Sequence, residues 1–452
     1  MIVLALLVIW CWGYALVSFF GKGFNLPLKV GISMLCGLGL NAATMFLYDL
    51  LHIPIVLFSV LGLAFGCVVA SFFKNWEVYK SDWDNLRSIR IGISEINFTW
   101  LFFFGILLYL LYGIYQKDMY WPVMEYDSVT GYDFMAKMIA AEGKLKVRVF
   151  DYTTDASTVA RFIYPPLVAC SYAIPYLCGM ALSKIISIVF FVALLLAFYG
   201  ALRVYTTHTA SMIVTVLMAV APEMFSHAAL ALTNLPNAAY ASLAMITFYI
   251  WTDKRTSEWF YLSAFTMAFN LFSRSDSIVF VMATLLVMTW MAIKEKKFAD
   301  LIRYGAISLS LFVGWMCYLK WVIHSNSADF FEKSLFWDGE KLDKIINYIL
   351  EFTVYETQFY GITFWMFLAL LALNVRVWRV DMTKFLLISL VAWIAYTFLY
   401  YQMNYKVASL DLFMKASYKR GMFCFVPLAW YYVATNRASS WFFNKIDGWL
   451  YR

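Results

Sequence analysis

The sequence predicts an all-α integral membrane protein with about thirteen transmembrane helices. Hydrophobic residues make up 63% of the chain and charged residues only 14%, whereas a soluble domain carries roughly 25% charged residues. The mean hydropathy of +0.71 is far from a soluble composition as well. Aromatic residues account for 20%, as expected where Trp and Tyr gather at many membrane–water interfaces.

The predicted helices come from apolar runs, because roughly 17–25 apolar residues suffice to cross a bilayer as a helix. The first run lacks a basic n-region and a small-residue cleavage site, so we expect a retained transmembrane helix and not a signal peptide. The runs are Ile2–Phe20, Leu28–Leu50, Ile53–Phe73, Phe98–Tyr115, Lys184–Tyr205, Ala210–Phe225, Leu235–Trp251, Trp259–Phe272, Ser277–Ile293, Leu301–Ile323, Phe359–Val375, Phe385–Tyr401 and Met422–Thr435.

These runs indicate a single transmembrane domain over residues 1–452. Residues 1–97 are expected to form N-terminal helices and a cytoplasmic loop. Residues 98–435 are expected to form the core, which carries an outer loop at 116–183. Within that loop the apolar stretch 165–180 can dip into the membrane or lie along it. The chain ends soon after its last apolar run, so we expect no soluble C-terminal domain.

Lys and Arg residues predict the orientation, because cytoplasmic loops of membrane proteins are enriched in both. If the 116–183 loop faces outward and each later run crosses, almost every short connection on the other side is basic, the Lys294–Lys297 turn among them. We therefore expect that side to be cytoplasmic. The remaining basic residues are concentrated in the outer segments 116–184, 320–344 and 406–420, where the rule does not require them.

A polar island at residues 122–144 interrupts the apolar pattern at the start of the outer loop. Two acids, Glu125 and Asp127, lie just beyond the membrane boundary. A single carboxylate there is more often a solvated loop residue, but this pair is followed by a helix and by a basic cluster that includes Arg161. A carboxylate at a membrane surface can act as general base on an acceptor hydroxyl or amine.

A short amphipathic helix is predicted directly after the two acids. Asp133 and Lys137 are spaced i,i+4 on its polar side, so we expect them to pair. A helix of this kind, tethered to a transmembrane segment, should lie in the plane of the interface. Its apolar side carries Val129, Tyr132, Met135 and Ile139.

Further polar residues stand at the outer ends of predicted helices. Two prolines after Tyr164 bar a helix and present this side chain on a stiff turn, although a simple loop-to-helix entry explains the pattern equally well. Asn234 lies at an outer helix start, where N-capping is the simpler explanation.

Charged residues also occur where little loop is present to solvate them. Arg274 and Asp276 lie between two apolar runs, at a membrane depth where charges are expensive and usually functional. Tyr418 and Arg420 directly precede the last run. A guanidinium at that depth is a good bidentate phosphate ligand, and the alternative is an interfacial Arg whose charge reaches up to water.

Several site classes are not indicated. The four His residues are scattered without ligand spacing, and the seven Cys residues include no CxxC pair. No phosphate-binding glycine loop or nucleic-acid module is present, so no nucleic-acid partner is expected. A divalent cation, Mg or Mn, held by Glu125 and Asp127 is an alternative that the sequence leaves open.

In their order along residues 98–435, these motifs resemble those of the GT-C class of polytopic membrane glycosyltransferases, which includes protein O-mannosyltransferases and aminoarabinose transferases. Bacterial members carry Trp-Asp-Ala with a Lys ten residues later, and Tyr126-Asp127-Ser128 with Lys137 is similar. They also carry a Tyr-Pro-Leu or Tyr-Pro-Pro turn, similar to Tyr164-Pro165-Pro166.

Three further motifs extend the resemblance. An Ala-Asp-x-Pro stretch is similar to Thr233-Asn234-Leu235-Pro236, a Lys-x-Glu-Gly pair to Arg274-Ser275-Asp276, and Ser-x-x-Arg to Ser417-Tyr418-Lys419-Arg420. The chain departs from the family at Asn234, which replaces the usual Asp, and at Ser277, where Gly is commoner. An amide cannot be a base or carry charge, so a carboxylate role at position 234 is in doubt.

The resemblance implies a GT-C fold and an inverting glycosyltransferase of cell-envelope glycan biosynthesis. Such an enzyme moves a sugar from a polyprenyl-phosphate or polyprenyl-diphosphate donor to a glycan, lipid or protein acceptor. It implies a bacterial inner membrane, with the active site facing the periplasm or exterior. By matching positions, Asp127 would be the general base, with Glu125 assisting. The residues implied to bind substrate are Lys137, Arg161, Tyr164, Asn234, Arg274, Asp276, Tyr418 and Arg420.

Two other functions remain open at this point. A transporter or flippase of lipid-linked sugars or small solutes would place ionisable residues near the middle of the bilayer on broken helices, often in two related halves. This chain carries them at outer helix ends and shows no internal repeat. A glycan polymerase or ligase would use outer-loop arginines in much the same way as a glycosyltransferase.

Overall fold

The computed structural model describes residues 1–21, 23–88, 97–152, 164–324, 337–375, 382–403 and 409–450. These ranges are predominantly helical and contain no β-strand, which confirms the predicted all-α class. Within them, eight helical segments are long and apolar enough to cross a membrane. They are α1 (Ile2–Phe20), α2 (Leu26–Leu50), α3 (Leu57–Lys74), α5 (Phe98–Tyr120), α10 (Ile185–Leu202), the segment Ser275–Glu295, the segment Ala299–Ile323 and α20 (Thr383–Tyr401).

The segment Ser275–Glu295 joins the 3-10 turn η3 (Ser275–Ser277) to α15 (Ile278–Glu295). The segment Ala299–Ile323 joins α16 (Ala299–Tyr318) to the π-helical turn η4 (Leu319–Ile323). Helices that miss the length or hydropathy expected of a span are α9 (Leu167–Leu177), α11 (His208–Ala219), α13 (Asn234–Lys254), α14 (Ser257–Ser273), α19 (Thr363–Leu373) and α23 (Phe425–Thr435).

The remaining helices are short or amphipathic. They are α4 (Trp76–Ser88), η2 (Ser128–Tyr132), α6 (Asp133–Glu142), α7 (Val149–Tyr152), α12 (Pro222–His227), α17 (Gly339–Leu350), η5 (Glu351–Tyr355), α18 (Thr357–Tyr360), α21 (Leu410–Phe413), η6 (Met414–Tyr418), α22 (Lys419–Met422) and α24 (Arg437–Leu450).

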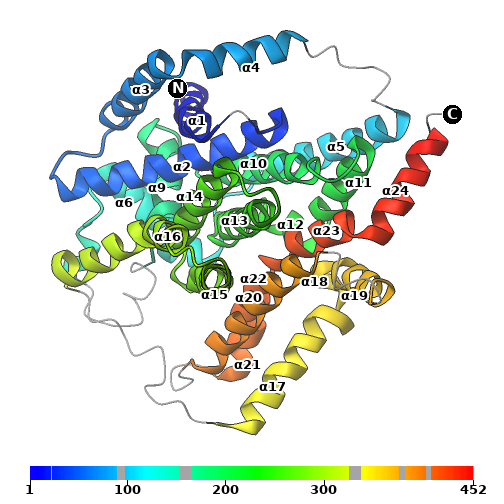
Figure 1. Ribbon diagram of the computed structural model, residues 1–452. Coiled ribbons are helices and arrows are strands. Elements are labelled where there is room, and N and C mark those ends of the chain that lie inside the picture. The colour runs from blue at the N-terminus through cyan, green and yellow to red at the C-terminus, as the bar shows by residue number, and fades with distance from the viewer. Residues whose placement is uncertain are drawn as a thin grey trace.

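The helix α13 forms the centre of the bundle and packs against α10, α14 and α23 (Figure 1). Nearly all of its side chains are buried, although its polar residues keep its hydropathy below that of a simple span. Helices α17, α20, α21 and α22 gather on one side of the molecule, away from α1, α3 and α4 (Figure 1). A protein-buried helix needs no apolar outer face, which explains why α13 is the least lipid-like of the long helices.

Polar contacts sort the helix ends into two groups. At one end, which we call the site end, the end of α5 meets the start of α10 through Asp118 and Lys184, and the end of α14 meets the start of α13 through Arg274 and Asn234. At the opposite end, Arg255 after α13 pairs with Glu295 at the end of α15. The helices α13, α14 and α15 therefore run in alternating directions, as do α5 and α10.

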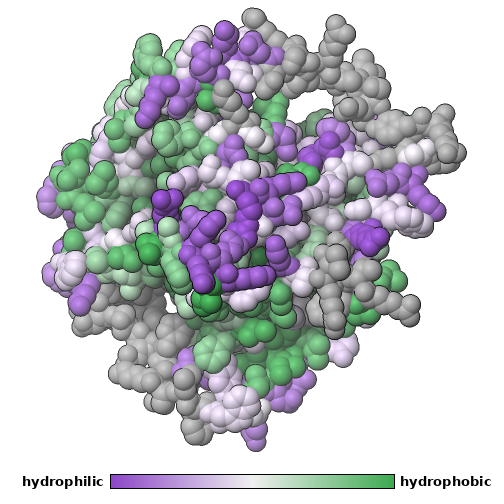
Figure 2. All heavy atoms as spheres, in the orientation of Figure 1, coloured by the Kyte–Doolittle hydropathy of each residue, from purple (hydrophilic) through white to green (hydrophobic). Residues whose placement is uncertain are grey.

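Helices α3 and α5 leave their apolar side chains uncovered by protein. Only 11% of the central window of each is buried, and Phe58 and Phe98 are 86% and 82% exposed. Figure 2 shows apolar patches on the left and in the lower part of the face in view, while hydrophilic side chains gather near its middle. Apolar patches of this extent mark a surface that water does not contact, as in a helical membrane protein.

Helix α2 packs closely against its neighbours because glycines remove side chains at the contacts. A Cβ atom added at Gly37 would lie 2.1 Å from the Ile9 carbonyl oxygen of α1. One added at Gly31 would lie 2.5 Å from the Ala193 carbonyl oxygen of α10. Small residues at helix contacts are typical of membrane bundles, where close packing replaces the hydrophobic effect as the source of association.

Three predicted spans are broken at the site end. The predicted run Ala210–Phe225 divides into α11 and α12, and α12 begins at Pro222, because proline favours the first position of a helix and cannot continue the preceding one. The run from Phe359 divides at Gly361, whose φ is +58°. The run from Met422 divides between α22 and α23. Helix breaks therefore concentrate where polar residues meet.

Candidate functional site

The predicted base and a predicted phosphate ligand lie in direct contact. Arg420 Nη1 donates a hydrogen bond to Asp127 Oδ2, and the two atoms lie 2.7 Å apart. Asp127 immediately precedes the π-helical turn η2, and Arg420 lies in α22, immediately after the π-helical turn η6. The two side chains are 34% and 39% exposed, so this ion pair remains open to solvent and to a ligand.

Arg274 forms the second, buried part of the site. Its Nε and Nη2 atoms donate to the two oxygens of Asp276 at 2.9 and 2.7 Å, in a bidentate pair. Its Nη1 atom donates to Asn234 Oδ1 at 2.8 Å and to Thr233 Oγ1 at 3.3 Å. Burial alone would lower the pKa of Arg274, but the adjacent Asp276 carboxylate raises it well above its ordinary value, so the guanidinium keeps its charge.

The same contacts explain Asn234, for which N-capping was the simpler interpretation, and its neighbour Asn237. Helix α13 begins at Asn234, but the structure shows no side-chain cap there. Asn234 instead accepts from Arg274, and Asn237 Oδ1 accepts from Ser277 Oγ at 2.6 Å. An amide oxygen can accept these hydrogen bonds as a carboxylate would, so the Asn that departs from the family pattern still serves as an acceptor.

Two tyrosines lie between the two arginine pairs. The rings of Tyr132 and Tyr164 meet edge to face at 5.7 Å, and the Arg274 guanidinium lies 5.9 Å from the centre of the Tyr164 ring. Asp127 is close enough to raise the pKa of both phenols slightly, although burial is the main cause of their raised pKa values. Both therefore remain neutral, able to hydrogen-bond but not to act as bases.

The other acid of the pair, Glu125, has a different environment from Asp127. Its Oε2 atom is buried and has no hydrogen-bond partner among the described residues. Its carboxylate lies within electrostatic range of Asp118 and Tyr172, deeper in the protein. Glu125 and Asp127, two residues apart in the sequence, thus lie in different surroundings.

Lys137 pairs with Asp133 at 2.8 Å, which confirms the predicted i,i+4 contact. Asp133 is 1% exposed and also accepts hydrogen bonds from Tyr176 and Ser183, so this pair anchors α6 on the protein. Lys137 therefore lies with Asp133 and not in the Asp127–Arg420 pair. Arg161, also predicted to bind substrate, lies outside the described residues.

Tyr418 is fully buried and faces α20. Its hydroxyl accepts a hydrogen bond from Trp393 Nε1 at 3.2 Å and contacts Thr397 Oγ1 at 3.1 Å. Trp393 and Thr397 also line an apolar cavity of about 560 Å³ between α17 and α20. The predicted site residue therefore connects the Arg420 segment to this cavity.

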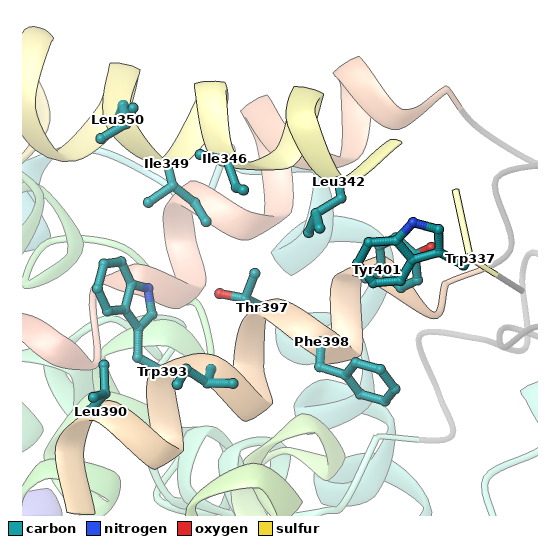
Figure 3. A pocket seen from close by; sticks show the side chains of 11 residues that line it. Trp337, Leu342, Ile346, Ile349, Leu350, Leu390, Trp393, Thr397, Phe398 and Tyr401 are labelled. Atoms are coloured by element: carbon teal, nitrogen blue, oxygen red, sulfur yellow. The ribbon is translucent and has the colours of Figure 1, made fainter. Parts of the chain in front are cut away.

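Side chains of α17 and α20 point toward one another across the cavity (Figure 3). The α17 helix is strongly amphipathic, with Ile345 and Ile349 buried and Asp343 and Lys344 exposed. A cavity of this size and apolar lining is typical of sites for apolar ligands. Its lining residues are Trp337, Leu342, Ile346, Ile349, Leu350, Leu390, Trp393, Ile394, Thr397, Phe398 and Tyr401.

A third polar group lies beside Arg420 and was not predicted. Glu223 Oε2 lies 3.0 Å from His227 Nε2, and Glu223 Oε1 lies 3.5 Å from Lys419 Nζ. Burial tends to raise the pKa of Glu223, but the contacts with His227 and Lys419 outweigh it and lower that pKa below its ordinary value. This group fixes the short helix α12 against the segment that carries Arg420.

A buried pair, Asp118 and Lys184, was also missed. Both are 1% exposed, at the end of α5 and the start of α10. In the sequence, Lys184 is one of the basic residues of the outer segment 116–184, which the orientation rule does not require, and no partner was predicted for it. The only signal was its position at the far end of the same loop that begins near Asp118.

The sequence left open a divalent cation held by Glu125 and Asp127. Asp127 is paired with Arg420, while the buried Glu125 Oε2 has no hydrogen-bond partner among the described residues. Over the ranges that the structure describes, no group of three or more His, Cys, Asp or Glu side chains is arranged to hold a metal.

The solvent-open groups of the site are thus the carboxylate of Asp127 and the guanidinium of Arg420. Beside them lie the buried Arg274 with its hydrogen-bond partners and two neutral phenols. Such a set can bind an anion and accept a proton. No family model, curated protein or solved structure matches this chain.

Proposed function

We propose that the chain is a membrane glycosyltransferase that moves a sugar from a polyprenyl-phosphate or polyprenyl-diphosphate donor to an acceptor. The observation that carries this proposal is the solvent-open Asp127–Arg420 pair, which combines a proton acceptor with a phosphate ligand. Transfer from a lipid phosphate needs these two functions together, since negative charge develops on the leaving phosphate while the acceptor loses a proton.

The ion pair represents a resting state in this proposal. An exposed ion pair contributes roughly 0–1 kcal/mol, so a donor phosphate can displace Asp127 from Arg420 at little cost. The guanidinium then holds the phosphate through two parallel hydrogen bonds. Asp127, released from its cation, becomes a stronger proton acceptor at the moment when donor is bound.

The chemical step follows from this exchange. An acceptor hydroxyl or amine attacks the anomeric carbon of the sugar and gives its proton to Asp127. The bond from that carbon to the phosphate oxygen breaks, and the polyprenyl phosphate leaves with the electron pair beside Arg420. Attack from the face opposite the leaving group inverts the anomeric configuration. Asp127, not Glu125, is assigned the base role because Asp127 is open to solvent beside Arg420, whereas one oxygen of Glu125, Oε2, is buried.

The buried pair Arg274–Asp276 is assigned a supporting role toward the sugar or phosphate. Four of its hydrogen bonds are made within the protein, to Asp276, Asn234 and Thr233. Its charge still reaches the region of Tyr164, and a fixed cation in a low-dielectric site stabilises developing negative charge.

The cavity between α17 and α20 supports a lipid-linked donor. Its lining is almost entirely apolar, and it is connected to the Arg420 segment through the Trp393–Tyr418 hydrogen bond. A donor with an anionic head and an isoprenoid tail would place the head at Arg420 and part of the tail in this cavity. Burial of a hydrocarbon chain contributes about 0.8 kcal/mol per methylene, so the tail would add substantially to affinity.

The same proposal includes thirteen crossing helices in a GT-C fold, in a bacterial inner membrane with the site end facing the periplasm. The alternating helix directions and the helix breaks at the site end support this arrangement. The exposed Asp127–Arg420 pair lies at helix ends, as an interfacial enzyme requires and a transporter with a mid-membrane site does not.

The test is a transfer assay with purified protein and synthetic polyprenyl-phosphate sugars. We expect time-dependent loss of donor, release of polyprenyl phosphate, and a product whose anomeric configuration is opposite to that of the donor. Because the sugar and acceptor are open, lipids and glycans of a deletion strain should be compared by mass spectrometry first to choose both. A strain with unchanged glycans and lipids, together with no turnover of any donor, would refute the proposal.

A further inference from the structure

Two consecutive residues hold both ends of the segment that carries Asp127. Ser183 Oγ donates to Asp133 Oδ1, at the end of this segment. Lys184 Nζ donates to the Trp121 carbonyl oxygen at 3.2 Å, at its start, and lies 3.6 Å from Asp118 Oδ1. Ser183 and Lys184 are 0% and 1% exposed, so both contacts are made in the protein interior.

The segment between these two contacts also carries contacts of its own. Ser128 Oγ donates to the Ala231 carbonyl oxygen, the Tyr132 ring packs against the Tyr164 ring, and Asp127 accepts from Arg420. The contacts made by Ser183 and Lys184 fix where this segment begins and ends, and so limit where Asp127 can lie.

We propose that Ser183 and Lys184 are positioning residues that hold Asp127 opposite Arg420. The proposal rests on the function proposed above, because it concerns the base of that reaction. Neither residue contacts the Asp127–Arg420 pair, and both act through the backbone of residues 121–133.

The charge arrangement explains why a lysine is needed at position 184. Neither oxygen of Asp118 has a hydrogen-bond partner among the described residues, so Lys184 is the nearest compensating charge for a fully buried carboxylate. Loss of the Lys184 side chain would remove this ion pair together with the contact to the Trp121 carbonyl oxygen, and the start of the segment would no longer be tied to α10.

A paired set of variants separates positioning from charge balance. Lys184→Met leaves Asp118 unpaired and removes the contact with Trp121. The double variant Asp118→Leu/Lys184→Met removes both charges, and we expect it to recover thermal stability but not turnover. The double variant Asp118→Asn/Lys184→Gln keeps an amide donor for the Trp121 carbonyl oxygen, and we expect it to recover both. Ser183→Ala is the milder test of the other end.

Two measurements are made on each variant. Hydrogen exchange of the peptide covering residues 121–132 reports the segment directly, since its Ser128 and Val129 amides bond to the Glu125 carbonyl oxygen. We expect faster exchange there and unchanged exchange in α13. Steady-state transfer should show kcat reduced on the order of 100-fold with the donor KM nearly unchanged, because the base is misplaced while Arg420 remains.

The opposite end of the bundle provides the matched control. Lys29 is a buried lysine, 3% exposed, that pairs with Asp82. Asp82→Leu/Lys29→Met should alter stability but leave kcat and exchange at residues 121–132 unchanged. The proposal is overturned if exchange at 121–132 does not change in Asp118→Leu/Lys184→Met, or if the control lowers kcat equally. If wild-type protein shows no transfer, the proposed function fails, while the exchange measurement still decides whether Ser183 and Lys184 fix the segment.

Discussion

Asp127 and Arg420 form an ion pair of 2.7 Å although 293 positions separate them in the chain. The contact joins the turn after α5 to the short helix before α23. The site is therefore built from residues in both halves of the sequence. Because each partner is about one third exposed, a ligand phosphate can compete for the guanidinium. The pair therefore links donor binding to release of the carboxylate.

Replacing Asp127 by Asn should reduce kcat by about 10²–10⁴-fold, the range over which general-base catalysis contributes. The donor KM should stay the same or fall, because Arg420 no longer has a carboxylate to exchange for the phosphate. Steady-state kinetics with varied donor measures both. Asp411→Asn is a suitable control, since Asp411 is an exposed acid at the same end that bonds Tyr348 instead. Wild-type turnover in Asp127→Asn would remove this residue from the chemistry.

Replacing Arg420 by Met should act mainly on donor binding. A hydrogen bond to a charged group is worth about 1.5–3 kcal/mol, which corresponds to a roughly 10- to 150-fold rise in donor KM. Arg420→Lys should recover only part of this, because an ammonium lacks the planar two-point geometry. Donor binding measured by titration gives the comparison. Equal affinity of the wild type and Arg420→Met would show that the phosphate lies elsewhere.

Sequence patterns predicted the helical elements well but the contacts between them poorly. The run Ile2–Phe20 is matched residue for residue by α1, because apolar length alone determines such a helix. The Asp133–Lys137 contact was predictable because helix geometry places residues i and i+4 together. The burial of Asp133 could not be predicted, since Tyr176 and Ser183 contact it from another part of the chain.

The site shows the same division. Asp127, Arg274 and Arg420 were singled out because charge at a membrane boundary is costly, whatever its partner. That Arg420 pairs with Asp127, and Arg274 with Asp276 and Asn234, depends on how distant helices pack. Lys184 was counted only among the basic residues of the outer segment 116–184, without a partner, and α17 was not predicted. The cavity beside α17 is formed by α17 and α20 together, and the pattern of a single sequence does not predict which helices pack against each other.

The Arg274–Asp276 pair should matter for stability. Removing one partner of a buried ion pair costs about 3–5 kcal/mol, because the other charge stays buried alone. Arg274→Met should therefore lower the thermal midpoint in detergent strongly, and Arg274→Met/Asp276→Leu should recover most of it. Arg255→Met is the control at the opposite end, where an exposed pair with Glu295 is worth roughly 0–1 kcal/mol. Similar midpoints for both single variants would contradict the buried role of Arg274.

The Glu223 group predicts a pH dependence of stability. His227 and Lys419 lower the pKa of Glu223 below its ordinary value, so the folded state favours the ionised carboxylate. This contribution is present above the pKa of the unfolded chain and is lost as the pH falls through the folded pKa. Thermal midpoints measured from neutral to acid pH should fall more steeply for the wild type than for Glu223→Gln. Parallel curves would show that Glu223 contributes nothing to acid sensitivity.

Filling the cavity between α17 and α20 should impair mainly the binding of long-chain donors. Ile346 is 44% exposed and lines the cavity, so Ile346→Trp places a larger side chain where the isoprenoid tail is proposed to lie. Losing burial of about two methylene groups costs roughly 1.6 kcal/mol, or more than a tenfold rise in donor KM. A donor with two isoprene units, which has little hydrocarbon to bury there, should show a much smaller change. Ile302→Trp on α16, where Ile302 is 68% exposed, is the matched control. Equal effects on short and long donors would place the lipid tail outside this cavity.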